Sequence, residues 1–181
     1  MNKNFHYTAF LRGINVGGHA RMKMADLRDM FETLGFQNVR TVLASGNVVF
    51  ESKENDGEVL TTKIESELKK AFKRDISVIL RSKDHLKKLQ ANEPFKGIEM
   101  TQDIQLYVTF LPEKLRPRTI TIPYTSPQED FSILSATFTE IFSIVDLSKG
   151  RGTPVLMNFL QKEYGTELTT RSWNTIIKIL K

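Results

Sequence analysis

A glycine-rich segment near the N-terminus carries the residues best suited to binding an anion. It reads Leu11-Arg12-Gly13-Ile14-Asn15-Val16-Gly17-Gly18 and lies between an apolar run and an amphipathic pattern. Glycine and asparagine tolerate left-handed backbone conformations, in which consecutive N–H groups can converge on an anion. Arg12 adds an always-charged guanidinium that matches phosphate or carboxylate with two parallel hydrogen bonds. The candidate ligand-binding residues of this segment are Arg12, Gly13, Asn15, Gly17 and Gly18.

The same segment also has a purely structural interpretation. Its glycine spacing fits neither the dinucleotide-binding fingerprint nor the P-loop, because it lacks the Gly-Lys-Ser/Thr ending. A tight connection from a strand to a helix, in which Arg12 only holds backbone carbonyls, would use the same residues. The sequence leaves both interpretations open.

Three further polar residues are candidates for the same site. Ser45 and Asn47 flank a glycine in a predicted hairpin turn, and turn chemistry alone would explain them. Arg171 lies near the start of a predicted last helix capped by Thr170. A cation at a helix N-terminus opposes the helix dipole unless an anion accompanies it. That anion is either a ligand or a surface carboxylate such as Glu167.

The apolar periodicity of the first half predicts the order strand, helix, strand, strand, helix, strand. This is the ferredoxin-like βαββαβ arrangement. Right-handed crossovers bring the end of the first strand, the hairpin turn and the entry to the last strand to one end of the sheet. We therefore expect the glycine-rich segment and the hairpin turn to be neighbours. The predicted elements are strand 5–11, helix 27–34, strands 39–44 and 48–50, helix 60–72 and strand 76–80.

The second half predicts another α+β region. We expect residues 1–81 to form the ferredoxin-like subdomain and residues 82–181 a second, smaller α+β subdomain with C-terminal helices, packed on the first. No internal repeat of residues is apparent. The expected elements are helix 82–89, strand 104–111, a proline-rich connector 112–127 with a short strand at 119–122, hairpin strands 131–135 and 140–147, a helix with Thr153 as its N-cap, and the last helix.

Composition excludes several kinds of site. The 181 residues include no cysteine and three scattered histidines, so we expect no metal site and no cofactor. No apolar stretch approaches the roughly 20 residues of a membrane span, and a cytoplasmic protein is expected. The net charge of +5 is modest, and paired basic residues such as Lys73-Arg74 are interpreted as solubilising. No pair of carboxylates suggests acid–base catalysis, so the sequence does not decide whether the protein is an enzyme.

Three motifs resemble those of a known family. They are Leu11–Gly18, Ala44-Ser45-Gly46-Asn47-Val48-Val49-Phe50 and Thr170-Arg171-Ser172-Trp173-Asn174-Thr175. In this order they are similar to the bacterial family catalogued as the domain of unknown function numbered sixteen ninety-seven. The resemblance implies a cytoplasmic bacterial protein with two α+β subdomains, the first of them ferredoxin-like. It implies no substrate, reaction or catalytic residue.

Three functions remain open at this point. The first is binding of a small anionic ligand or nucleotide at the glycine-rich segment. The second is RNA binding, because RNA-recognition domains share the βαββαβ order and could stack bases on Tyr7, Phe10 or Phe50. The third is an interaction protein without a ligand site. The oligomeric state is not indicated by the sequence.

Overall fold

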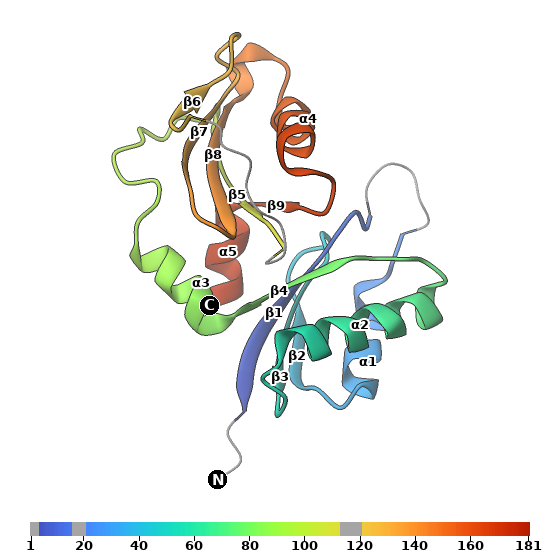
Figure 1. The fold of residues 1–181 in the computed structure, drawn as a ribbon. Helices are drawn as coiled ribbons and strands as arrows, with labels where there is room; N and C mark the ends of the chain where they lie inside the picture. The colour runs from blue at the N-terminus through green and yellow to red at the C-terminus, as the bar shows by residue number, and fades with distance from the viewer. Residues whose placement is uncertain (1–3, 16–20, 113–120) are drawn as a thin grey trace. The chain divides into compact units, whose positions relative to one another are not determined.

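Two antiparallel sheets and their helices form a mixed α+β structure (Figure 1). The computed structural model describes residues 4–15, 21–112 and 121–181. The chain divides into two compact units. The first is Met1–Lys88 together with Ile177–Lys181, and the second is Leu89–Ile176. The sequence-based boundary after Arg81 lies within the last part of the first unit's continuous segment.

The first unit has the order of elements that the sequence predicts. Its sheet has the strand order β2-β3-β1-β4, in which β1 pairs antiparallel with both β3 and β4. The helix that follows β4 runs on into the second unit. The elements are β1 (Phe5–Leu11), α1 (Met24–Thr33), β2 (Gln37–Thr41), β3 (Asn47–Ser52), α2 (Gly57–Phe72), β4 (Val78–Ser82) and α3 (Lys83–Ala91).

Helices α1 and α2 cover one face of this sheet (Figure 1). On α1, Leu27, Met30 and Phe31 repeat at helical spacing and are buried. They join the strand residues Tyr7 and Phe50 in one apolar core. The apolar periodicity of the sequence therefore determines which face of α1 packs on the sheet.

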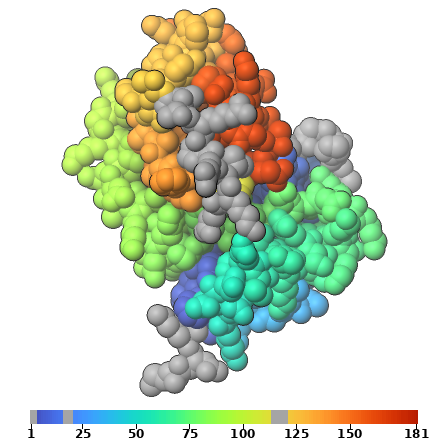
Figure 2. Space-filling model, in the orientation of Figure 1, coloured from blue at the N-terminus to red at the C-terminus, as the bar shows by residue number. Residues whose placement is uncertain are grey.

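Helix α2 has sequence signals at both ends. The side chain of Asp56 caps its N-terminus by accepting hydrogen bonds from the backbone N–H groups of Glu58 (2.9 Å) and Val59 (3.1 Å). Lys69 and Lys70 lie in the last turn, where positive charge is favourable to the helix dipole. The outer side of α2, coloured teal to green, is exposed on the face shown in Figure 2.

The second unit carries the larger sheet, with the strand order β6-β7-β8-β5-β9. The predicted strand at 119–122 lies partly outside the described residues, and the described strand of this connector is β6. No helix in the described parts of the chain is both long and apolar enough to span a membrane. The elements are β5 (Ile104–Phe110), β6 (Tyr124–Thr125), β7 (Phe131–Ala136), β8 (Glu140–Asp146), the 3₁₀ turn η1 (Leu147–Lys149), α4 (Thr153–Tyr164), β9 (Thr169–Ser172) and α5 (Trp173–Leu180).

Two predictions about helix starts are wrong. Thr170 does not cap the last helix, because Thr169–Ser172 is strand β9, and its Thr170 hydroxyl lies 2.7 Å from that of Thr109 on β5. Pairing with β5 overrides the local capping pattern, and the helix begins at Trp173 instead. For α4 the N-cap is Gly152 rather than Thr153, which is the first helical residue.

The two sheets share a strand order that the sequence did not reveal. The order β2-β3-β1-β4 of the first unit corresponds to β7-β8-β5-β9 of the second. The registers correspond as well, since Tyr7 pairs with Ser82 and Tyr107 pairs with Ser172. Residues 7–11 and 107–111 accordingly share the pattern Tyr-x-x-Phe-Leu, which is too short to be noticed without the strand pairing.

Candidate functional site

Three chain connections meet at one end of the first unit's sheet. The backbone N–H of Leu11 donates to the carbonyl of Gly46 in the hairpin turn (2.8 Å). The next N–H, that of Arg12, donates to the carbonyl of Ser77 just before β4 (3.0 Å). The predicted proximity of the glycine-rich segment and the hairpin turn is therefore confirmed for the described part of that segment.

Asn15 closes the loop that follows β1. Its backbone has a φ of 56°, in the left-handed region. Its side-chain amide donates to the backbone carbonyls of Ala44 (2.8 Å) and Met22 (3.2 Å). Its side-chain oxygen accepts from the N–H of Met22 (2.7 Å). The Asn15 side chain thus connects the described residues after β1 with Met22 and with the hairpin turn.

Asn47 has a similar structural role inside the turn. Its side chain is fully buried and donates to the carbonyl of Val42 (2.7 Å) and to the hydroxyl of Ser45 (3.0 Å). The backbone N–H of Val42 in turn donates to the carbonyl of Asn47 (2.8 Å). Buried amide groups that are satisfied in this way stabilise a turn.

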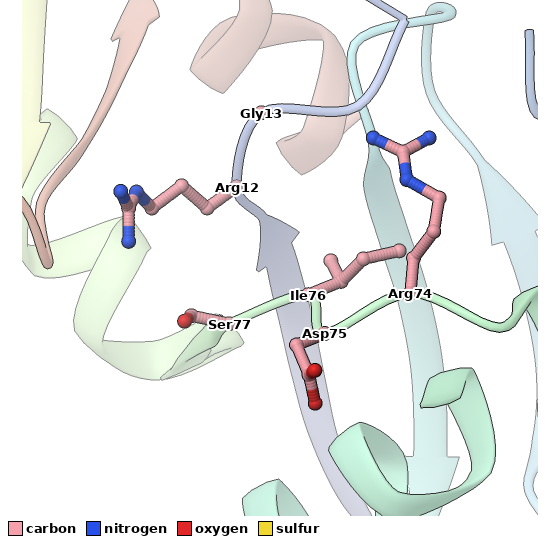
Figure 3. Close-up of a pocket in the computed structure, with 6 residues that line it drawn as sticks. All are labelled: Arg12, Gly13, Arg74, Asp75, Ile76 and Ser77. Carbon is pink, nitrogen blue, oxygen red and sulfur yellow. The ribbon is translucent and has the colours of Figure 1, made fainter. Parts of the chain in front are cut away.

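A polar hollow of about 210 Å³ opens beside this junction. Figure 3 shows the side chains of Arg12 and Ser77 on one side of it and the side chain of Arg74 on the other, with the backbone of Gly13 between them. The lining residues among those described are Arg12, Gly13, Arg74, Asp75, Ile76 and Ser77.

The electrostatics of the hollow favour an anion. Arg12 and Arg74 are both half-buried, which reduces the screening of their charges by water. Asp75, the one carboxylate among the described lining residues, has its Oδ1 atom 2.8 Å from Nζ of Lys69. Gly13 has a φ of 62°, and a Cβ atom placed there would meet no atom of the described residues within 4 Å. The described part of the chain therefore leaves space beside Gly13.

Sequence reasoning missed Arg74 and Ser77. The pair Lys73-Arg74 was expected only to solubilise a helix, but Lys73 ends α2 in a left-handed conformation and Arg74 lines the hollow. The available signal was the expectation that the entry to the last strand lies at the same end of the sheet as the first strand's exit. Applied to residues 73–77, that expectation would have included Arg74.

Among the described candidate residues from the sequence, Arg12 and Gly13 line the hollow, whereas Asn15, Ser45, Asn47 and Arg171 do not. Gly17 and Gly18 lie outside the described residues. Arg171 lies on β9 in the second unit, where its guanidinium donates to the hydroxyl of Thr169 (2.7 Å) and the carbonyl of Thr170 (2.9 Å). Burial of this charged group lowers the pKa of Arg171 to about 10.

The two basic residues of the loop before α4, Lys149 and Arg151, both form ion pairs. Nε of Arg151 lies 3.2 Å from Oδ2 of the buried Asp130, and Nζ of Lys149 lies 3.8 Å from Oε2 of Glu129. Carboxylates from the preceding turn therefore offset the positive charge of this loop. No three His, Cys, Asp or Glu residues of the described ranges are grouped so that they could hold a metal ion.

The comparisons with known proteins address the family and the fold. A family model described as "Protein of unknown function (DUF1697)" matches residues 5–134. The chain belongs to this family. A solved structure of the conserved bacterial protein SP0830 from Streptococcus pneumoniae is 22% identical, covers 99% of this chain and 100% of that chain, and has a TM-score of 0.72.

The structure of SP0830 shows that the two proteins share a fold. An unknown protein from Galdieria sulphuraria is 12% identical over 94% of this chain and 99% of that chain, with a TM-score of 0.28, which is too low to indicate a shared fold. No curated protein matches the chain. Family membership confirms the resemblance carried by the sequence motifs, and the family's description assigns no function.

Proposed function

We propose that this protein binds a small ligand through a phosphate or carboxylate group in the hollow beside Gly13. The observation that carries the proposal is the presence of two arginines, Arg12 and Arg74, in the lining of one polar hollow beside Gly13. Each charge-assisted hydrogen bond from arginine to such a group contributes about 1.5–3 kcal/mol where water is excluded.

The distribution of charge supports this assignment to the first unit. That unit contains 18 Lys and Arg residues against 11 Asp and Glu, a formal charge of +7. The second unit contains 8 against 10, a formal charge of −2. An anionic ligand is therefore attracted to the first unit over a longer range than the hollow itself.

The corresponding corner of the second unit supplies a contrast. There the N–H of Leu111 donates to the carbonyl of Thr139 (2.8 Å), as Leu11 does to Gly46. By strand register, however, Pro112 takes the position of Arg12 and Glu167 that of Ser77. The proline lacks an N–H and the glutamate is acidic, so of these two described pairs of positions the pair in the first unit is the better suited to an anion.

The fold of the first unit and the location of the protein are proposed separately from its ligand. We propose a ferredoxin-like fold for the first unit, supported by the element order β1-α1-β2-β3-α2-β4 and the strand order β2-β3-β1-β4. We also propose a cytoplasmic location, which the absence of cysteine in the sequence supports.

RNA binding is less well supported than binding of a small anion. Stacking of bases requires exposed aromatic rings on the sheet. Phe10 and Phe50 are fully buried and Tyr7 is nearly so, with Tyr7 and Phe50 packed 5.9 Å apart in the apolar core. The rings that the RNA hypothesis required are therefore not exposed to bases.

A thermal-shift titration with orthophosphate and, separately, citrate tests the proposal. A ligand at 100 times its Kd adds about 2.7 kcal/mol to the free energy of unfolding of a protein that binds it. We expect stabilisation of the wild type and a loss of most of it in Arg12→Ala and in Arg74→Ala.

Arg28→Ala is the matched control. Arg28 is on α1, is paired with Asp29 (3.1 Å) and Glu32 (3.7 Å), and does not line the hollow. The control removes one positive charge from the same unit and should respond like the wild type. Absence of stabilisation by either anion, or an equal response in all variants, would overturn the proposal.

A further inference from the structure

We propose that the ligand of the hollow is an oligophosphate chain rather than a compact single anion. This inference rests on the function proposed above and specifies its ligand class. It concerns two or more linked phosphates, either as an inorganic chain or as the oligophosphate part of a nucleotide.

The directions of the two arginines carry the inference. In Figure 3 the side chains of Arg12 and Arg74 extend to opposite sides of the Gly13 backbone. A bidentate contact requires the guanidinium and the oxyanion to lie in one plane at hydrogen-bond distance. Two guanidiniums that extend apart are therefore better suited to two separate phosphates than to one.

Neighbouring residues extend the same arrangement on each side. The hydroxyl of Ser77 lies on the Arg12 side of the hollow and adds a polar group to that side. On the other side, Arg74 follows directly after Lys73, whose side chain is exposed at the end of α2. An oligophosphate carries negative charge along its whole length, so it can meet both sides at once.

The described lining of the hollow offers no aromatic ring on which a base could stack. None of its described lining residues is aromatic, and Ile76 is the one large apolar residue among them. Recognition of nucleic acid without sequence preference depends on stacking of bases on aromatic rings. The lining therefore favours the phosphate chain itself over a single-stranded nucleic acid.

Isothermal titration calorimetry at low ionic strength tests the inference with orthophosphate, tripolyphosphate, citrate and ATP. We expect tripolyphosphate to bind the wild type at least about tenfold more tightly than orthophosphate or citrate. Citrate is the compact control, because it carries several negative charges without a linear chain. A Kd for ATP within about threefold of the Kd for tripolyphosphate supports recognition of the phosphate chain alone.

The variants separate a two-sided site from general attraction by charge. We expect Arg12→Ala and Arg74→Ala each to remove most of the advantage of tripolyphosphate over orthophosphate. Arg28→Ala should retain this advantage. Arg74→Lys keeps the charge but loses the planar fork, so it should retain only part of the advantage. Circular dichroism confirms that each variant is folded.

The outcomes distinguish this inference from the function on which it rests. Orthophosphate binding without an advantage for tripolyphosphate, or equally tight citrate, overturns the oligophosphate inference and leaves the proposed function standing. An equal loss in Arg28→Ala also overturns the inference. If ATP binds far more tightly than tripolyphosphate in the wild type and in both arginine variants, the protein recognises the base or the ribose. That outcome overturns the oligophosphate inference. The absence of any binding overturns both proposals.

Discussion

A methyl group added to Gly46 would lie 2.7 Å from Cδ1 of Ile14 and 3.0 Å from Cβ of Leu11. Gly46 belongs to the hairpin turn and Ile14 to the loop after β1, so this contact packs the two connections against each other. The φ of Gly46 is 77°, which L-amino acids with a side chain rarely adopt. Both the backbone conformation at position 46 and its close packing on Ile14 and Leu11 therefore require a glycine there.

We expect Gly46→Ala to lower the free energy of unfolding by about 2–4 kcal/mol, because left-handed strain and overpacking add. Gly35→Ala is the matched control, since Gly35 has a φ of 84° but no atom of the described residues within 4 Å of an added methyl. The control should lose only about 1–2 kcal/mol. Urea unfolding measures both values. Equal losses would show that packing on Ile14 contributes nothing.

We expect Asn47→Ala to destabilise the protein by about 1–3 kcal/mol, because the carbonyl of Val42 loses its donor in a buried turn. Asn47→Asp should cost more, since a buried carboxylate has no amide hydrogen to donate. Ser45→Ala, at an exposed position, should cost about 0.5 kcal/mol or less. Chemical denaturation of the three variants tests this order, and a mild effect of Asn47→Asp would contradict it.

Stability at acid pH should depend on Glu51. Its carboxylate accepts side-chain hydrogen bonds from Asn38 (2.9 Å) and Asn4 (3.1 Å), and these lower the pKa of Glu51 below its ordinary value of 4.5. The contribution of a carboxyl group with a lowered pKa is complete above the unfolded-state pKa. It is lost as the pH falls through the folded-state pKa.

We therefore expect the wild type to lose more stability than Glu51→Gln between about pH 5 and pH 3, as the carboxylate becomes protonated. Thermal unfolding at several pH values measures the difference in slope. Parallel pH profiles for the two proteins would show that the hydrogen bonds to Glu51 do not contribute to stability.

Arg171→Ala should act on stability and leave anion binding unchanged. The substitution removes a buried side chain and the donors to Thr169 and Thr170, and we expect a loss of at least about 2 kcal/mol. Lys162→Ala, at an exposed position of α4, is the control with a small effect. Orthophosphate affinity, measured below the melting temperature, should match the wild type. A weakened affinity would instead favour the interpretation of Arg171 as a ligand-binding residue.

Local residue patterns determined much of the first unit. The apolar run Phe5–Leu11 predicts β1 with its observed bounds, and the spacing of Leu60, Ile64 and Leu68 predicts α2. The proximity of the glycine-rich segment and the hairpin turn also follows from sequence. Connections of fixed handedness place the exit of the first strand and the hairpin turn at one end of a sheet with this element order.

The tertiary structure decided three other features that local residue patterns did not reveal. Residues 169–172 form a strand because β5 supplies hydrogen-bond partners that no local pattern reveals. The burial of Phe10 and Phe50 depends on the tertiary structure. Alternation along a strand shows that it has two faces, but it does not show what covers each face. Arg74 joins Arg12 at the hollow because Ser77, three residues after Arg74, pairs with Arg12 across the sheet, a contact between residues 65 positions apart. Short-range patterns determine the elements, whereas long-range pairing and burial determine which side chains meet.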